Sequence, residues 1–293
     1  MGAIQVCEES PLRARMRVKL QPLAALTLLL AVFAAGIQAQ SPSDKKEFQP
    51  YVGLPGKDVL WLPAEAVMVN KMLDLARVSP DDLVVDLGSG DGRTVIAAAK
   101  RGARGLGVEY NSQLLEYSRR LAAQEDVADR AQFVKADLFQ YELSQASVIT
   151  LFLLPSINLE LRPKLLGLKP GTRIVSNTFT MAEWQHDDMI TDESKPDCSF
   201  NCVAYLWIVP ARVEGVWRFS QGDVKLTQQF KMLAGSLQAG NASTPVTGRL
   251  RGDRISLSAG DTEYTGRVND GTIEGKFKSG ANTGDWRATW VDK

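Results

Sequence analysis

The sequence predicts an α/β fold: an open, mostly parallel sheet covered by helices, followed by an antiparallel β domain. Between residues 83 and 209, short apolar runs rich in β-branched residues alternate with helical segments. This alternation is typical of a parallel sheet whose strands are joined by crossover helices. After Pro210 the pattern changes, because residues 210–293 hold half of the chain's 24 glycines and show little helical periodicity. The change indicates a second domain of short strands and tight turns.

The segments of the first domain follow one another in a regular order. Apolar residues recur at helical spacing within residues 59–78, and Pro80 breaks that pattern. We expect the final strand of this domain to pair antiparallel with an earlier segment. The remaining predicted segments are a strand at 83–87, a glycine turn at 88–92, a helix at 93–101, a strand at 105–109, a helix at 111–124 capped by Asn111 or Ser112, strands at 131–135 and 147–154, a helix at 158–166, and strands at 172–177 and 200–209.

The second domain consists of short runs separated by turn signals. Gly260-Asp261 and Asn269-Asp270-Gly271 are two such signals, and their regular recurrence favours a small antiparallel barrel or a sandwich. The predicted strands lie at 215–219, 225–230, 254–257, 263–268, 272–277 and 286–290. Trp217, Trp286 and Trp290 are interpreted as core rather than as a ligand rim, because large aromatic side chains contribute most when buried.

Composition and charge exclude several classes of protein. The chain has 293 residues with 34 Lys+Arg and 34 Asp+Glu, so it has no basic excess and we expect no nucleic-acid partner. Three cysteines and one histidine are too few for a cysteine-rich zinc module or a disulfide scaffold. We therefore expect no metal site. Cys198 and Cys202 are separated by three residues, and the sequence leaves open whether they pair.

The first forty residues have the features of a secretory signal. Four basic residues between positions 13 and 19 precede residues 20–43, which carry no charge, and Ala39 ends the apolar stretch. We therefore predict a signal peptide at 1–39 and an exported protein, periplasmic or secreted. The alternative is an uncleaved membrane anchor at 20–39, although its apolar core is short for a helix of ~20 residues. Any membrane contact is expected only through this segment.

This organisation divides the chain into four regions. Residues 1–39 are the signal peptide, and residues 40–56 form a polar, proline-containing linker or docking segment. Residues 57–209 form the sheet domain, and residues 210–293 form the β-rich C-terminal domain.

The glycine turn after the first strand carries the most specific chemical signal. Asp86 is followed by Gly88, Ser89 and Gly90 in a G-x-G-x-G pattern, with Arg93 where a dinucleotide fingerprint would place its last glycine. A carboxylate at Asp86 would repel a pyrophosphate. It would attract a ligand that carries an ammonium and a sulfonium group, and S-adenosylmethionine carries both.

Two further acids follow the next two strands. Glu109 ends the second strand, where a carboxylate can accept both hydroxyls of a ribose. Asp137 follows the third strand and is placed to accept from an adenine amino group, while Leu138 can cover the ring face. Ligands of open α/β sheets bind at the carboxyl ends of the strands. The predicted cofactor-binding residues are Asp86, Gly88, Ser89, Gly90, Glu109, Asp137 and Leu138.

With these motifs the chain resembles the class I S-adenosylmethionine-dependent methyltransferases. It is similar in particular to protein-lysine methyltransferases typified by the mitochondrial ATP synthase c-subunit lysine methyltransferase. The resemblance covers roughly residues 50–209 and rests on Tyr51-Val52 with Pro55, Trp61-Leu62-Pro63, Asp86 to Arg93, Ala97 to Lys100, Gly107 to Asn111 and Lys169 to Arg173. It implies a Rossmann-like sheet of seven strands with the last one antiparallel. It also implies Asp86, Gly88 and Gly90 at the methionyl end, Glu109 at the ribose and Asp137 at the adenine.

The chain departs from related patterns at two places. Trp61-Leu62-Pro63-Ala64 stands where the family usually has Pro-Thr-Pro. Phe152-Leu153-Leu154-Pro155 stands where methyltransferases acting on amino groups often carry a polar residue, two prolines and an aromatic residue. The second departure argues against methylation of nucleic-acid bases.

The resemblance implies methyl transfer to a lysine amine of a protein. Desolvation in an apolar slot would keep that amine neutral without a strong base. The residues that could line such a slot are Trp61, Phe152, Leu154, Phe179 and Trp184. Neither Glu65 nor His186 is predicted as a catalytic base, so the catalytic residues stay unknown. The alternatives are a small-molecule methyltransferase and an exported binding protein with a degenerate methyltransferase fold.

Overall fold

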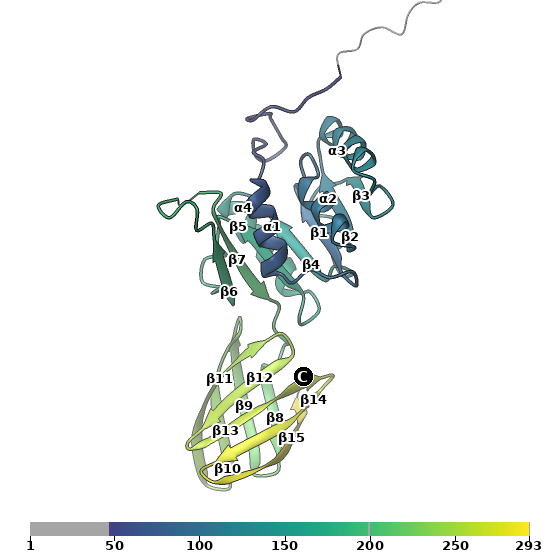
Figure 1. Ribbon diagram of the computed structural model, residues 1–293. Coiled ribbons are helices and arrows are strands. Elements are labelled where there is room, and N and C mark those ends of the chain that lie inside the picture. Colours follow the sequence, from purple (N-terminus) through teal and green to yellow (C-terminus); the bar gives the residue numbers. More distant parts are fainter. Residues whose placement is uncertain (1–46, 199, 293) are drawn as a thin grey trace, which may run out of the picture. The chain divides into compact units, whose positions relative to one another are not determined.

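The computed structural model describes residues 47–198 and 200–292 (Figure 1). The predicted signal peptide, residues 1–39, and the first residues of the predicted linker lie outside this part. Within it, no helix is both long and apolar enough to cross a membrane.

A seven-stranded sheet forms the first domain, as predicted, with the strand order β3-β2-β1-β4-β5-β7-β6. The first five strands are parallel, and β7 runs antiparallel to both β5 and β6. The strands are β1 Leu83–Leu87, β2 Arg104–Glu109, β3 Ala131–Lys135, β4 Val148–Leu151, β5 Arg173–Asn177, β6 Asp188–Thr191 and β7 Val203–Ile208. This topology places the carboxyl ends of β1, β2 and β3 side by side, so residues that follow these strands meet at one edge.

Helices cover both faces of the sheet (Figure 1). The helices are α1 Ala66–Leu75, α2 Arg93–Lys100, α3 Ser112–Gln124 and α4 Pro155–Leu166. Val84 packs with α1 and α2, whereas the next residue, Val85, packs with α4. Side chains of a strand alternate between the two faces, so a run of apolar residues is needed where both faces are buried. Asn111 caps α3 by accepting from the backbone N–H groups of Gln113 and Leu114.

The second domain is a closed barrel, which decides between the two architectures left open by the sequence. All neighbouring strands are antiparallel, and β15 pairs with β8 to close the barrel. The strands are β8 Gly215–Phe219, β9 Gly222–Gln229, β10 Met232–Ala239, β11 Ala242–Arg251, β12 Arg254–Ala259, β13 Thr262–Asn269, β14 Thr272–Ser279 and β15 Asn282–Asp292. Consecutive strands are joined by two-residue turns, several of which use positive φ, as in Gly240 and Gly280. Trp217, Phe219 and Trp286 fill the interior.

Several sequence boundaries were wrong. The strand predicted to reach residue 154 ends at Leu151, because Pro155 begins α4 three residues before the predicted helix start. Proline is favoured in the first turn of a helix, where its missing N–H has no partner to lose. The prediction also missed β6, β10 and β11. Their sequences contain Gly235, Pro245 and exposed polar residues in place of a sustained apolar pattern.

Candidate cofactor site

The glycine turn between β1 and α2 forms the floor of the candidate site. Gly88, Gly90 and Gly92 have φ values of 74°, 55° and 79°, a region that favours glycine. Space is also limiting, since a Cβ on Gly90 would lie 2.3 Å from Nε1 of Trp61. The N–H groups of Gly88 and Ser89 both donate to the carbonyl of Val108, at 2.9 and 3.1 Å. The turn is therefore tied to β2.

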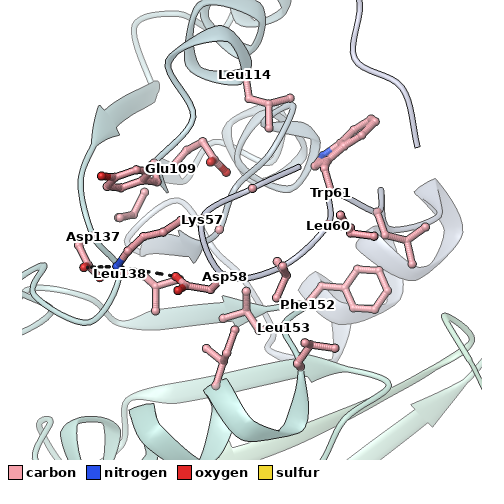
Figure 2. Close-up of a pocket in the computed structure, with 18 of the residues that line it drawn as sticks. Lys57, Asp58, Leu60, Trp61, Glu109, Leu114, Asp137, Leu138, Phe152 and Leu153 are labelled. Carbon is pink, nitrogen blue, oxygen red and sulfur yellow. Dashed lines mark hydrogen bonds and ion pairs between the residues drawn. The ribbon is translucent and has the colours of Figure 1, made fainter. Parts of the chain in front are cut away.

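A cavity opens above the carboxyl ends of the strands, with an empty volume of about 960 Å³ including its mouth. Figure 2 shows Glu109, Asp137 and Leu138 on one side and Trp61, Phe152 and Leu153 on the other. A smaller hollow of about 420 Å³ adjoins it and is lined by Asp86, Ser89 and Gly90 among others. The two share Gly88, Trp61, Leu62 and Phe152. The seven residues predicted to bind the cofactor thus line two adjoining hollows.

Residues 56–62, which we call the strap, cross the cavity between these walls. The strap is held by backbone hydrogen bonds from Gly56 N–H to the Val59 carbonyl and from Trp61 N–H to the Leu54 carbonyl, at 3.0 and 2.8 Å. Its Lys57 and Trp61 lie on opposite sides of the cavity (Figure 2). The indole of Trp61 lies against Gly90, where the two hollows meet. The strap therefore narrows the passage from one hollow to the other.

Asp86 is buried at the end of β1, with only 7% of its surface exposed. The hydroxyl of Thr150, on the neighbouring strand β4, donates to Oδ1 of Asp86 at 2.6 Å. Burial raises the pKa of the Asp86 carboxyl to about 7, because water no longer solvates the charge, while hydrogen bonds from Thr150 and Thr94 oppose the rise. Asp91 and Glu109 add a smaller repulsion in the same direction as burial. A cation in the adjoining hollow would favour ionised Asp86.

Glu109 links the end of β2 to the glycine turn. One carboxylate oxygen accepts from Gly90 N–H at 2.9 Å, and the other accepts from Asn111 N–H at 2.8 Å. Hydrogen bonds to both oxygens fix the orientation of the carboxylate. Each oxygen keeps a further lone pair that can accept from a hydroxyl group. Glu109 also lines the cavity, so it can present this carboxylate to a ligand.

Asp137 lies at the end of the cavity beyond Glu109. Its carboxylate accepts from Lys57 Nζ at 2.7 Å and from Phe139 N–H at 2.9 Å. The hydrogen bond from Lys57 is the largest cause that holds the pKa of Asp137 below its ordinary value. Lys57 Nζ also lies 5.5 Å from the ring centroid of Tyr110. The strap lysine therefore occupies the carboxylate predicted to bind adenine.

The residues predicted for an apolar acceptor slot separate into two groups. Trp61, Phe152, Leu154 and Phe179 line the cavity. Trp184 does not, because it is fully buried within the core on the α4 face of the sheet. Among the described residues, Glu65 pairs with Lys195 and His186 packs on Tyr205 and Trp207, and neither lines the two hollows.

Lys57, Tyr110 and Phe200 are among the cavity-lining residues that sequence reasoning missed. Phe200 lies between two cysteines, and Tyr110 directly follows Glu109. The adjacent cysteines and Glu109 were the sequence features that could have identified Phe200 and Tyr110 as site residues. Lys57 had no such signal, because only the fold brings the strap to Asp137, eighty positions away in the sequence.

The residues present fit S-adenosylmethionine. Ser89 Oγ is buried and has no hydrogen-bond partner among the described residues, and a bound polar group would supply one. The glycine turn offers a concave surface that side chains would fill. Among residues 47–198 and 200–292, no group of three or more His, Cys, Asp or Glu side chains could hold a metal ion.

Comparisons with known proteins agree that the matching proteins are methyltransferases. A family described as "ANTKMT methyltransferase domain" matches residues 86–188. A protein-lysine N-methyltransferase of Saccharolobus islandicus is 39% identical over 154 residues, which cover 52% of this chain and 94% of that protein. An ATP synthase c-subunit lysine N-methyltransferase of Xenopus laevis is 34% identical over 207 residues, which cover 70% of this chain and 78% of that protein.

A solved structure is also similar in sequence. It is described as an RNA methyltransferase from Salinibacter ruber in complex with S-adenosyl-L-homocysteine, with 41% identity and a TM-score of 0.48. The match covers 52% of this chain and 96% of that one.

Proposed function

This chain belongs to the family of S-adenosylmethionine-dependent protein-lysine N-methyltransferases, and from that membership we propose that it methylates the side-chain amine of a lysine in a protein. The observation that carries the proposal is that Asp86, Glu109 and Asp137 line two adjoining hollows that share Gly88, beside an apolar cavity wall. The three acids suit the cofactor, and the apolar wall suits an amine that must lose its charge.

We assign one part of the cofactor to each acid. Asp86, with Gly88, Ser89 and Gly90, faces the methionyl end, where ammonium and sulfonium groups favour a carboxylate. Glu109 accepts from the ribose hydroxyls, and Asp137 accepts from the adenine amino group beside Leu138. Lys57 must leave Asp137, and Trp61 must move from Gly90, for one ligand to reach both hollows.

The chain's contribution to methyl transfer is orientation and exclusion of water. S-adenosylmethionine supplies a methyl group already activated by its sulfonium. Phe152, Leu154 and Phe179 line the cavity with apolar surface, and burial among such groups lowers the pKa of an amine. The acceptor nitrogen is then neutral and has a free lone pair. The proton lost on entry goes to water, so no side chain is assigned as a base.

Export is part of the proposal. The basic lead and the apolar stretch that ends at Ala39 support cleavage there, and the mature chain would begin at Gln40. N-terminal sequencing of the mature protein tests this, since an N-terminus that precedes the apolar stretch would instead support an anchor.

A labelling experiment tests the reaction. The purified full chain is incubated with methyl-labelled S-adenosylmethionine and, separately, with protein, RNA and small-molecule fractions of the cells that make it. We expect label in the protein fraction, recovered after hydrolysis as ε-N-methyllysine. Label confined to RNA or to small molecules would reject the lysine acceptor.

Variants separate the enzyme from a protein that only binds the cofactor. Glu109→Ala removes both carboxylate contacts and should abolish transfer. Glu125→Ala is the matched control, because Glu125 is exposed and pairs with Lys100 on α2. Cofactor binding without transfer by the wild type would favour the binding protein.

A further inference from the structure

Three phenylalanine rings from separate segments meet at the mouth of the cavity. Phe152 follows β4, Phe179 follows β5, and Phe200 lies in the loop before β7. The ring centroid of Phe200 lies 5.9 Å from that of Phe152 and 6.0 Å from that of Phe179. All three line the cavity, yet 48% of Phe200 remains exposed. The exposed part of Phe200 is therefore free to contact a molecule that enters the cavity.

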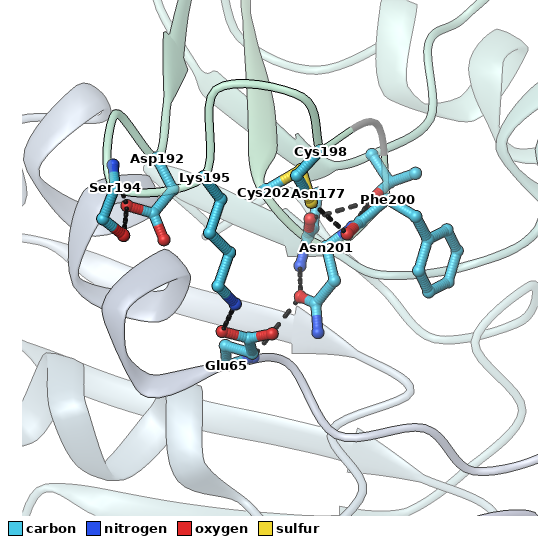
Figure 3. The surroundings of a disulfide bond; sticks show 10 residues. Glu65, Asn177, Asp192, Ser194, Lys195, Cys198, Phe200, Asn201 and Cys202 are labelled. Carbon is cyan, nitrogen blue, oxygen red and sulfur yellow. Dashed lines mark hydrogen bonds and ion pairs between the residues drawn. A yellow bond between two sulfur atoms is a disulfide. The ribbon is translucent and has the colours of Figure 1, made fainter.

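A disulfide holds the loop that carries Phe200. Cys198 and Cys202 are bonded, so the chain forms a small covalent ring around positions 198–202 (Figure 3). Cys202 is buried while Cys198 is exposed. The buried end anchors the loop to the start of β7, and the bond limits the positions open to Phe200.

Asn201, within the loop closed by the disulfide, connects this loop to two other segments (Figure 3). Its side-chain oxygen accepts from Asn177 Nδ2 at 2.7 Å and from Glu65 N–H at 3.3 Å. Its own N–H donates to Thr178 Oγ1 at 2.7 Å. The loop is thereby fixed to the end of β5 and to the first residue before α1.

The backbone beside this network is strained. Thr178 has a φ of 67° and Asn201 has a φ of 57°, and a left-handed conformation is rare for a β-branched residue such as threonine. Thr178 N–H donates to the Val203 carbonyl at 2.7 Å, which holds the conformation. Strain of this kind persists where surrounding contacts over-determine the backbone, and it clusters at functional sites. Here it lies next to Phe179 and Phe200, two of the three rings.

We propose that Phe200 determines which acceptors enter the cavity, and that the Cys198–Cys202 disulfide is the positioning element that keeps its ring against Phe152 and Phe179. The proposal rests on the proposed function. The methylene chain of the acceptor lysine lies along the three rings, and the exposed edge of Phe200 contacts the residues next to that lysine. The acceptor class is therefore a lysine flanked by apolar side chains.

Two peptides test the specificity. One has a central lysine between leucines, and the other has the same lysine between glycines. The wild-type chain should methylate the leucine peptide with the lower KM. Phe200→Ala should raise that KM about ten-fold, in the range of one lost apolar contact, and should abolish the preference. Met189→Ala is the matched control, because Met189 is similarly exposed but does not line the cavity.

The measurements distinguish a wrong role for Phe200 from a wrong proposed function. Affinity for S-adenosylhomocysteine, measured by calorimetry, should be the same in the wild type and in Phe200→Ala. Transfer by both with equal KM overturns the role of Phe200 and leaves the proposed function intact. Absence of transfer to either peptide by the wild type, with the cofactor bound, counts against the proposed function itself.

Removal of the disulfide tests the positioning role. Dithiothreitol gives two electrons and two protons to the bond and becomes a cyclic disulfide, while Cys198 and Cys202 become thiols. Complete reduction, verified by thiol titration, should raise KM for the leucine peptide and leave kcat unchanged. The Cys198→Ser/Cys202→Ser variant should show the raised KM and no response to dithiothreitol. An unchanged KM after complete reduction overturns the role of the disulfide.

Discussion

The ammonium nitrogen of Lys57 lies 2.7 Å from a carboxylate oxygen of Asp137, at the end of the cavity that we assign to adenine. The strap thus uses the group that a bound cofactor needs. Trp61, also in the strap, lies against Gly90, which we assign to the methionyl end of the cofactor. Gly90 precedes Asp137 by forty-seven residues in the sequence. Under the proposed function, the strap must leave this position before the cofactor can contact both Asp137 and Gly90.

Replacement of Lys57 should strengthen cofactor binding. Lys57→Gln removes the ion pair and leaves Asp137 free to accept from adenine, so the Kd for S-adenosylhomocysteine should fall several-fold. An exposed ion pair is weak because water screens it, so the expected change is small. Titration calorimetry measures the change. Lys100→Gln, which breaks the exposed pair with Glu125, should leave the Kd unchanged, and a weaker Kd in Lys57→Gln would contradict the competition.

Cofactor affinity should depend on pH through Asp86. Its pKa is about 7 in the folded protein, and a cationic ligand favours the ionised form. Below pH 7 binding must release a proton, so the Kd should fall by up to about ten-fold per unit as pH rises towards 7 and then level off. Calorimetry in buffers of different ionisation enthalpy would detect the released proton. Asp86→Asn should bind weakly and show no such slope.

The same carboxyl group should affect stability in the opposite direction. The pKa of the Asp86 carboxyl is 3.8 in the unfolded chain and about 7 in the folded protein. Between these two pH values Asp86 is protonated in the folded protein and ionised in the unfolded chain. The contribution of Asp86 to the free energy of unfolding is therefore fully present below about pH 4, and it is lost as pH rises to 7. Denaturant unfolding should show that Asp86→Asn gains stability relative to the wild type as pH rises. A gain in the stability of Asp86→Asn at low pH instead would show that burial is not the main influence on the pKa of Asp86.

Two glycine variants separate backbone strain from loss of space. Gly90 and Gly280 both have positive φ, at 55° and 61°, but only Gly90 has a side chain within 3 Å of the position of a Cβ. Gly280→Ala should cost roughly 1–2 kcal/mol of folding free energy for its left-handed backbone, and Gly90→Ala should cost more because its Cβ also displaces Trp61. Only Gly90→Ala should weaken cofactor binding, by about ten-fold or more, equivalent to about 1.4 kcal/mol. Equal binding in both variants would show that the turn does not contact the ligand.

The barrel core should be independent of the cofactor site. Trp217 is fully buried, donates to the Val213 carbonyl at 2.8 Å and packs 4.9 Å from Trp290 between ring centroids. Trp217→Ala should cost about 3–5 kcal/mol of folding free energy, seen as a lower Tm of the barrel. Cofactor Kd should not change, because the described residues that line the two hollows all precede β8. Met232→Ala, at an exposed barrel position, controls for truncation of a side chain.

Local sequence signals predicted the elements that follow simple rules. The glycine turn and β3 were predicted correctly, and Asn111 is the one of the two candidate residues that caps α3, since each feature depends on neighbouring residues. β6, β10 and β11 were missed because their exposed residues carry little apolar periodicity. Those strands depend on hydrogen bonds to partners already in place, and such pairing is not visible in one segment.

The sequence by itself determined the alternation of strands and helices from β1 to β5, and the three acids at or just after the ends of β1, β2 and β3. Parallel strands end at one edge, so spacing along the chain was enough to bring Asp86, Glu109 and Asp137 together. Only the tertiary structure decided that Asp86 is buried enough to raise its pKa, that Lys57 reaches Asp137, and that Phe200 joins two other rings. These contacts join segments far apart in sequence, and their strength depends on burial, which packing of the whole domain creates.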